Sequence, residues 1–147
     1  YSSGRRDSMT PLFCSHVEEL WRIGMTTDHP TVPIYFDNTD APNNENTQYA
    51  VIHIVASEDT MPINLGITAK SRNVGLIQVD SFAPVDYGPG AAQGIAVYSG
   101  KLFKRRVDAV GNEGQVTFKD YSTMSTGQVG GKFRYVMRIP YRYDFEE

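Results

Sequence analysis

The sequence predicts an α+β fold, in which two helices pack on one face of a mainly antiparallel sheet of four to six strands. Three observations support this fold class: an amphipathic helical pattern near the N-terminus, a second helical pattern over residues 91–109, and a long period-two alternation over residues 132–147. The 147 residues are expected to form one domain, 1–147, around a single core, and no internal repeat divides them. Residues 1–9 are expected to be a flexible N-terminal segment of that domain.

The first helix is expected from Leu12 to Ile23. Thr10 and Pro11 precede it in an order that favours a helix start, because Thr caps free backbone donors and Pro suits the first turn. Gly24 is the expected end. The apolar side chains cover about half of the circumference, which predicts a helix lying flat on another layer; they are Leu12, Phe13, Val17, Leu20, Trp21 and Ile23.

The middle of the chain predicts strands separated by loops. Residues 32–37 predict a short strand, which Pro33 confines to a sheet edge or a strand start. Residues 49–57 are nearly all apolar and predict a central strand covered on both faces. The polar residues 38–47 are expected to be a loop, and residues 60–71 are expected to be either an extended excursion or a long hairpin loop. Another strand is expected over residues 73–82.

The last third of the chain begins with a turn at residues 86–90 and the second helix, 91–109. Its apolar stripe is Ala91, Ile95, Tyr98 and Leu102. A turn at 111–114, a strand at 115–121 and a loop of small residues at 122–131 are expected next. The final strand carries apolar side chains on one side and arginines on the other: the apolar side holds Phe133, Tyr135, Met137, Ile139, Tyr141, Tyr143 and Phe145, and the polar side holds Arg134, Arg138, Arg142 and Asp144.

Composition excludes several classes of protein. The formal net charge is −3 and the pI about 5.6, whereas a dedicated nucleic-acid binder is normally basic. Cys14 is the single cysteine, so no internal disulfide forms and a reducing compartment is favoured. No apolar run approaches the ~18 residues of a membrane span, and residues 1–8 lack the apolar core of a signal peptide. A membrane partner is therefore not expected.

The residues that carry chemistry form no catalytic or metal-binding motif. The three histidines, His16, His29 and His53, have no metal-site spacing, and His16 and His53 are expected to be hydrogen-bonded core or interface imidazoles. Cys14 and His16 would point roughly 160° apart on a helix, so they cannot form a nucleophile–base pair. Residues 88–90 match neither phosphate-binding glycine motif and predict a turn. The sequence predicts no catalytic residue, no metal and no cofactor, and a protein that is not an enzyme.

Two basic sets are candidate interface residues. Lys101, Lys104 and Arg105 share an arc of about 100° on the expected second helix, followed by Arg106. They could complement the helix dipole, form a solvated face, or contact an acidic neighbouring subunit or passing DNA. Arg134, Arg138 and Arg142 share one side of the last strand. That set is typical of the wet face of a sheet, and in a ring it could face a channel or bond across an interface.

The last strand, GGKFRYVMRIPYRYDF, resembles the closing strand of the bacteriophage tail terminator (tail completion) family, in which an alternating strand runs into a Pro-Tyr-Arg-type segment. Here that segment is Ile139-Pro140-Tyr141-Arg142-Tyr143-Asp144. The preceding elements agree in order: an amphipathic helix, PIYFDN, a polar loop, YAVIHIV, a strand with Gln78-Val79-Asp80, and a helix starting at Gly-Pro-Gly-Ala-Ala. The resemblance spans about residues 11–145; residues 1–8 and 61–72 are unmatched.

This resemblance implies a virion structural protein that forms a homo-oligomeric, hexameric ring. The ring would cap the tail tube, end tube polymerisation and join the tail to the head-side connector or neck protein. Its partners would be the tail tube protein and the connector, with DNA passing non-specifically through the lumen, and it would assemble in the host cytoplasm. Tyr141 and Tyr143, within the resembling segment, are expected at the interface together with the two basic sets.

Three other functions are alternatives to a tail terminator. Another neck, connector or tail tube subunit would come from the same virion, and a tube subunit would polymerise into long stacks. A small hydrolase with a pocket near Asp86 would require titratable groups that converge in a cleft. A generic ligand-binding α+β module would be a monomer with an apolar pocket.

Overall fold

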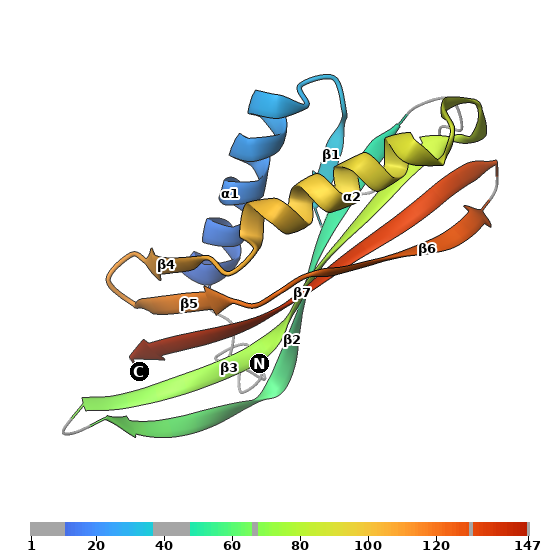
Figure 1. Cartoon of the computed structure of the whole chain (residues 1–147). Helices are drawn as coiled ribbons and strands as arrows, with labels where there is room; N and C mark the ends of the chain where they lie inside the picture. The colour runs from blue at the N-terminus through green and yellow to red at the C-terminus, as the bar shows by residue number, and fades with distance from the viewer. Residues whose placement is uncertain (1–10, 37–47, 66–67, 130, 147) are drawn as a thin grey trace, which may run out of the picture.

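The computed structural model describes residues 11–36, 48–65, 68–129 and 131–146. Two helices, α1 (Pro11–Asp28) and α2 (Pro89–Phe103), lie on the same face of a long, curled sheet (Figure 1). The predicted α+β class is confirmed, although the described residues form a sheet of seven strands where four to six were expected. The predicted flexible segment 1–9, Thr10 and the whole predicted loop 38–47 lie outside the described residues.

The strands are β1 (Ile34–Phe36), β2 (Tyr49–Leu65), β3 (Thr68–Pro84), β4 (Val107–Val110), β5 (Gly114–Phe118), β6 (Ser122–Val129) and β7 (Lys132–Glu146). They follow the order β1-β2-β3-β7-β5-β4, and β6 pairs with β7. Among the strand pairs of the described residues, only β1 and β2 run parallel. β7 organises the sheet: one edge pairs with β3 over its whole length, and the other pairs first with β6 and then with β5.

The final strand confirms its predicted alternation. On the side facing the helices, Met137, Ile139 and Tyr141 are at most 2% exposed. Phe13 of α1 packs on Tyr143 and Tyr141, with ring centroids 4.6 and 4.9 Å apart. A strand between a helical layer and solvent needs period-two alternation, which explains why this element was readable from sequence.

Helix α1 is longer than predicted, because Gly24 lies inside it. The helix buries Phe13, Val17, Trp21 and Met25, one residue in every four, at 0% exposure. A Cβ at Gly24 would come 2.8 Å from Cδ2 of Leu102. The glycine therefore lets α2 approach α1 closely, and it does not end the helix. The chain leaves α1 at Asp28.

Helix α2 is shorter than predicted and ends at Phe103. Lys104 is its C-cap, and Arg105 adopts a left-handed backbone with φ 54°. Residues Val107–Val110 then form β4, antiparallel to β5. The prediction of helix to residue 109 was wrong because pairing with β5 outweighs the helical pattern, and no glycine marks the helix end.

Two predicted loops are strands. Residues 60–65 continue β2 and pair with β3 down to Leu65 opposite Thr68, so the predicted excursion is a long, paired hairpin. Residues 122–129 form β6 along the free edge of β7. Met124 and the next four residues are exposed, so β6 needs no apolar alternation, and its sequence of small polar residues gave no strand signal. The apolar strand 49–57 is covered on both faces only at its start, since Val55 is 50% exposed.

Candidate protein interface

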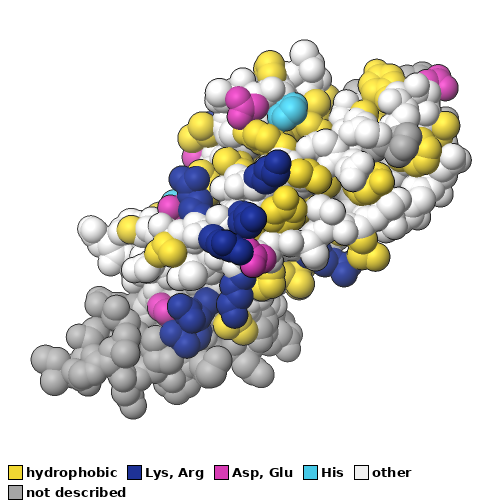
Figure 2. Space-filling view, viewed as in Figure 1, with side chains coloured by type: hydrophobic (Ala, Val, Ile, Leu, Met, Phe, Trp, Pro, Cys, Tyr) yellow, Lys and Arg dark blue, Asp and Glu magenta, His cyan; other side chains and the backbone are white. Residues whose placement is uncertain are grey.

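The first basic set lies at the end of α2. Lys101 occupies the last helical turn, whereas Lys104 and Arg105 follow it, and all three are exposed. Figure 2 shows Lys and Arg side chains in a band across the middle of the molecule, with hydrophobic side chains on both sides. The predicted arc of three residues on one helix is wrong, because Lys104 and Arg105 lie beyond the helix end.

Arg105 is already engaged within the chain. Its Nε donates to Oδ1 of Asp120 over 2.7 Å, and this bond lowers the pKa of the Asp120 carboxyl. Both side chains are mostly exposed, so the pair contributes little to stability. Arg106 turns to Asp108, with 2.8 Å between Nε and Oδ2. Lys101 and Lys104 are therefore the members of this set best placed to meet a partner.

The three arginines of β7 project from the sheet face opposite the helices, and their environments differ. Arg134 Nη2 lies 3.1 Å from Oδ2 of Asp80. Arg138 is exposed, and its Nε donates to Oε1 of Gln78 over 3.1 Å. Arg142 Nε lies 3.8 Å from Oδ2 of Asp144, beyond hydrogen-bond distance. We call this side of the sheet the outer face.

Asp80 is the centre of a polar network that sequence reasoning missed. The residue is only 6% exposed, and besides Arg134 it accepts a 2.9 Å hydrogen bond from Nε2 of Gln78. Nε2 of His53 lies 3.4 Å from Oδ2 of Asp80, which places His53 on the outer face of β2. The available signal was the i, i+2 spacing of Gln78 and Asp80, which puts both on one side of a strand. Their partner strand could not be read from the sequence.

The carboxylate of Asp144, the nearest to Arg142, is already paired with another arginine. Arg72 Nε and Nη2 donate to its two carboxylate oxygens over 2.7 and 3.2 Å, a bidentate pair. Among the described residues, Nε of Arg142 is buried and has no hydrogen-bond partner. Arg142 therefore leaves positive charge on the outer face.

Tyr141 and Tyr143 were predicted at the interface, and burial corrects this. They are 2% and 0% exposed and stand on the helix side of β7. The hydroxyl of Tyr141 donates to Oδ1 of Asn73 over 2.8 Å, and burial raises the pKa of the Tyr141 phenol, with Cys14 adding to the rise. The Tyr143 hydroxyl donates to Glu113. Both side chains belong to the core and cannot touch another subunit in this conformation.

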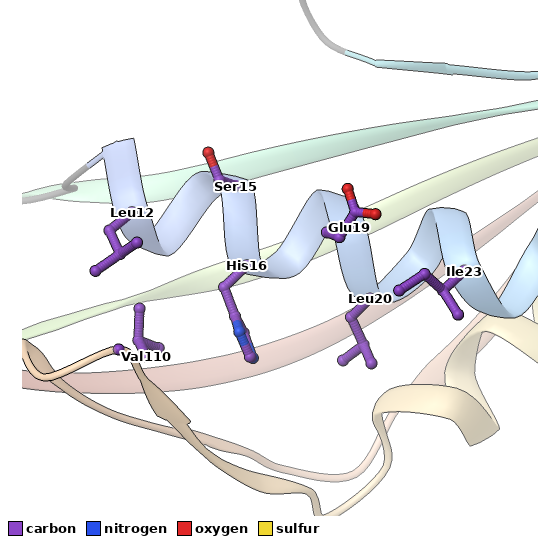
Figure 3. A pocket seen from close by; sticks show the side chains of 8 residues that line it. Leu12, Ser15, His16, Glu19, Leu20, Ile23 and Val110 are labelled. Carbon is purple, nitrogen blue, oxygen red and sulfur yellow. The ribbon is translucent and has the colours of Figure 1, made fainter.

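Two apolar depressions accompany the charges. On the outer face, a hollow is lined by the apolar side chains of Val55, Val74, Leu76 and Pro140, with Lys119 and Arg142 at its border. The second runs along α1, where Leu12, His16 and Leu20 extend toward β4 and Val110 reaches back (Figure 3). His16 lies in this groove, with Nε2 3.2 Å from Oδ2 of Asp108.

Outside these surfaces, the described residues offer little for a reactive or metal-binding site. The thiol of Cys14, the single cysteine of the chain, is half-buried. In the described ranges, no group of three or more His, Cys, Asp and Glu residues is placed to hold a metal ion. Over the same ranges, neither helix is both long and apolar enough for a membrane crossing.

No protein-family model matches the chain, and no curated protein matches it. One solved structure, known only by a sequence identifier, is 18% identical and superposes with a TM-score of 0.72 over 95% of this chain and 99% of its own. That likeness shows a shared fold. A chain from the virion of a native gene transfer agent particle is 11% identical over 89% of this chain and 92% of its own, with a TM-score of 0.49. The second likeness is too slight to support an argument.

Proposed function

We propose that this chain is a structural subunit of a long-tailed phage virion and does not act as an enzyme. Six copies would form a ring that caps the tail tube, ends tube polymerisation and joins the tail to the head-side connector. The observation that carries the proposal is the sequence resemblance to tail terminators over about residues 11–145, centred on the strand that became β7. Assembly would take place in the host cytoplasm and end in the neck of the virion.

The composition of the outer face supports self-assembly. A solvated sheet face carries mainly polar side chains, whereas here exposed Val55, Val74 and Met124 lie among the arginines. Contiguous exposed apolar surface is a mark of protein contact, and Arg is the cation most enriched at interfaces. The outer face therefore has the chemistry of a surface that another protein covers.

The open edge of the sheet also supports assembly. Within the described ranges, β6 pairs with β7 on one side and has no strand on the other. Free edges invite further pairing, and a closed ring of head-to-tail contacts leaves no interface unfilled. A ring is thus a physically reasonable end state for this protomer.

Electron microscopy and the native mass of the purified chain test the proposal. A cap predicts single six-fold rings, with the mass of six chains, that do not stack as protein concentration rises. Long stacks would instead identify a tube subunit. Monomers at every concentration, with no ring of this chain in the virion, would refute the proposed role.

A further inference from the structure

We propose that copies of this chain join head to tail by inserting a short knob of one copy into the outer-face hollow of the next. The knob is the single 3₁₀ turn Val85–Tyr87, which links β3 to α2. The hollow is the depression bordered by Lys119 and Arg142. This inference rests on the proposed ring and names the surfaces that would close it.

The hollow is built by the register of three strands. Val55 stands opposite Leu76, and Leu76 stands opposite Pro140, so their side chains form one apolar row across β2, β3 and β7. The next outer-face row pairs Val74 with Arg142. Scattered apolar residues are normal on protein surfaces, but here Val55 in the first row is 50% exposed and Val74 in the next row is 39% exposed, and such adjoining apolar surface indicates a contact site.

The border of the hollow is positive. The backbone N–H of Lys119 donates to the carbonyl of Pro140 over 3.0 Å, which fixes Lys119 beside the apolar row. Arg142 stands at the other side, and Arg72 already occupies both oxygens of its nearest carboxylate, that of Asp144. An occupant that fits would present apolar side chains next to a carboxylate.

The knob has that composition. Tyr87 is 56% exposed, Val85 is 37% exposed, and the exposed Asp86 lies between them. No described cation forms an ion pair with Asp86. A tyrosine beside an aliphatic side chain is typical of the residues that dominate interface energies, and the carboxylate complements Lys119 and Arg142.

The knob is also held in place before it meets a partner. The N–H of Val85 donates to the carbonyl of Gly131 over 3.2 Å, and the N–H of Gly88 donates to the carbonyl of Val85 over 3.1 Å. A turn that is closed by its own hydrogen bond and tied to Gly131 at its start loses little conformational freedom on binding, which favours affinity.

One chain cannot fill its own hollow. Leu76 and Val85 are nine residues apart along and just beyond β3, which corresponds to about 30 Å of extended strand. The contact must therefore join two copies. Because knob and hollow are different surfaces, the interface is heterologous, and repeating it gives a ring if the rotation closes.

Zero-length carbodiimide crosslinking of the assembled wild-type protein tests the contact directly. The reagent joins a carboxylate to an amine only where they touch, and the spacing along β3 excludes this link within one chain. We expect peptides joined through Asp86 and Lys119 in the crosslinked oligomer, identified by mass spectrometry after digestion. An oligomer crosslinked elsewhere, with no Asp86–Lys119 peptide, would overturn the inference.

Charge reversal provides the second measurement. Asp86→Lys and Lys119→Glu should each raise the dissociation constant of the oligomer at least tenfold, and the double variant should recover most of the loss. Gln93→Lys, at an exposed position on α2, is the control and should assemble like wild type. Unchanged native mass in both single variants would overturn the knob contact and leave the proposed ring intact. A wild-type chain that never self-associates would overturn both.

Discussion

The indole Nε1 of Trp21 donates a 3.0 Å hydrogen bond to Oγ of Ser99, joining α1 to α2 at a point where both residues are fully buried. Trp21 supplies much of the apolar surface of α1, and a buried indole N–H requires an acceptor. This bond fixes the two helices relative to each other, and it leads to a prediction about stability.

Replacing the acceptor should destabilise the fold. Ser99→Ala leaves the Trp21 N–H buried without a partner, which costs about 1–3 kcal/mol of unfolding free energy. Chemical denaturation followed by Trp fluorescence measures the change. Ser122→Ala, at an exposed position on strand β6, is a control and should shift the free energy by less than about 0.5 kcal/mol. Equal stability of the two variants would mean that the hydrogen bond contributes nothing.

Two glycines of α2 should respond in opposite directions to the same substitution. A Cβ at Gly100 would lie 2.3 Å from the ring of Tyr121, whereas a Cβ at Gly94 meets nothing within 4 Å. Gly100→Ala should cost about 1–3 kcal/mol through overpacking. Gly94→Ala should gain up to about 1 kcal/mol from helix propensity. Thermal unfolding of both variants checks this, and a stabilised Gly100→Ala protein would show that the Tyr121 contact is absent.

The hydroxyl of Tyr98 makes stability depend on alkaline pH. Its single O–H has two acceptors within reach, Oδ2 of Asp28 at 2.6 Å and the carbonyl of Gly24 at 2.8 Å, and it donates to one of them at a time. Desolvation, with the hydrogen bond to Asp28 and its charge adding to it, raises the pKa of Tyr98 from its ordinary value of 10 to about 12. The folded state therefore favours the neutral phenol. Its stabilising contribution is complete below pH 10 and is lost as the pH rises from about 10 to about 12.

Comparison with Tyr98→Phe isolates this contribution from general alkaline unfolding. The difference in unfolding free energy between wild type and Tyr98→Phe should stay constant from pH 8 to 10 and shrink above pH 10. A difference that does not change up to pH 12 would contradict the raised pKa.

The sequence predicted an element correctly where the hydrophobic pattern of that element alone determines its structure. β7 has the core on one side, and apart from buried Val136 its outer side is polar or exposed, so its alternation predicted the strand and the sides of Met137 and Arg138 correctly. The apolar arc of α1 likewise predicted a packed helix. At both places, the local periodicity and the tertiary environment agree.

The predictions were wrong or incomplete where a contact with a residue distant in sequence determines the local structure. Residues 122–129 form a strand because β7 has a free edge there, and Gly24 continues a helix because α2 packs against it. Arg105 adopts a backbone conformation typical of glycine, and its N–H donates to the carbonyl of Lys119 over 3.2 Å. Asp80 as the partner of Arg134 depends on the register of β3 with β7, which no local pattern encodes.

Reversing the charges of Lys101 and Lys104 together should impair assembly more than folding. Both side chains are exposed at the end of α2, where surface substitutions change the unfolding free energy by less than about 0.5 kcal/mol each. If an acidic surface of a neighbouring subunit or connector covers them, Lys101→Glu with Lys104→Glu replaces attraction by repulsion. The native mass of the purified variant should then fall below that of wild type while its melting temperature stays close. Gln93→Glu combined with Thr27→Glu, at two exposed positions on the same helical layer, adds the same two carboxylates without removing a lysine and should assemble like wild type. Full-size rings from the lysine variant would exclude this end of α2 from the interface between subunits.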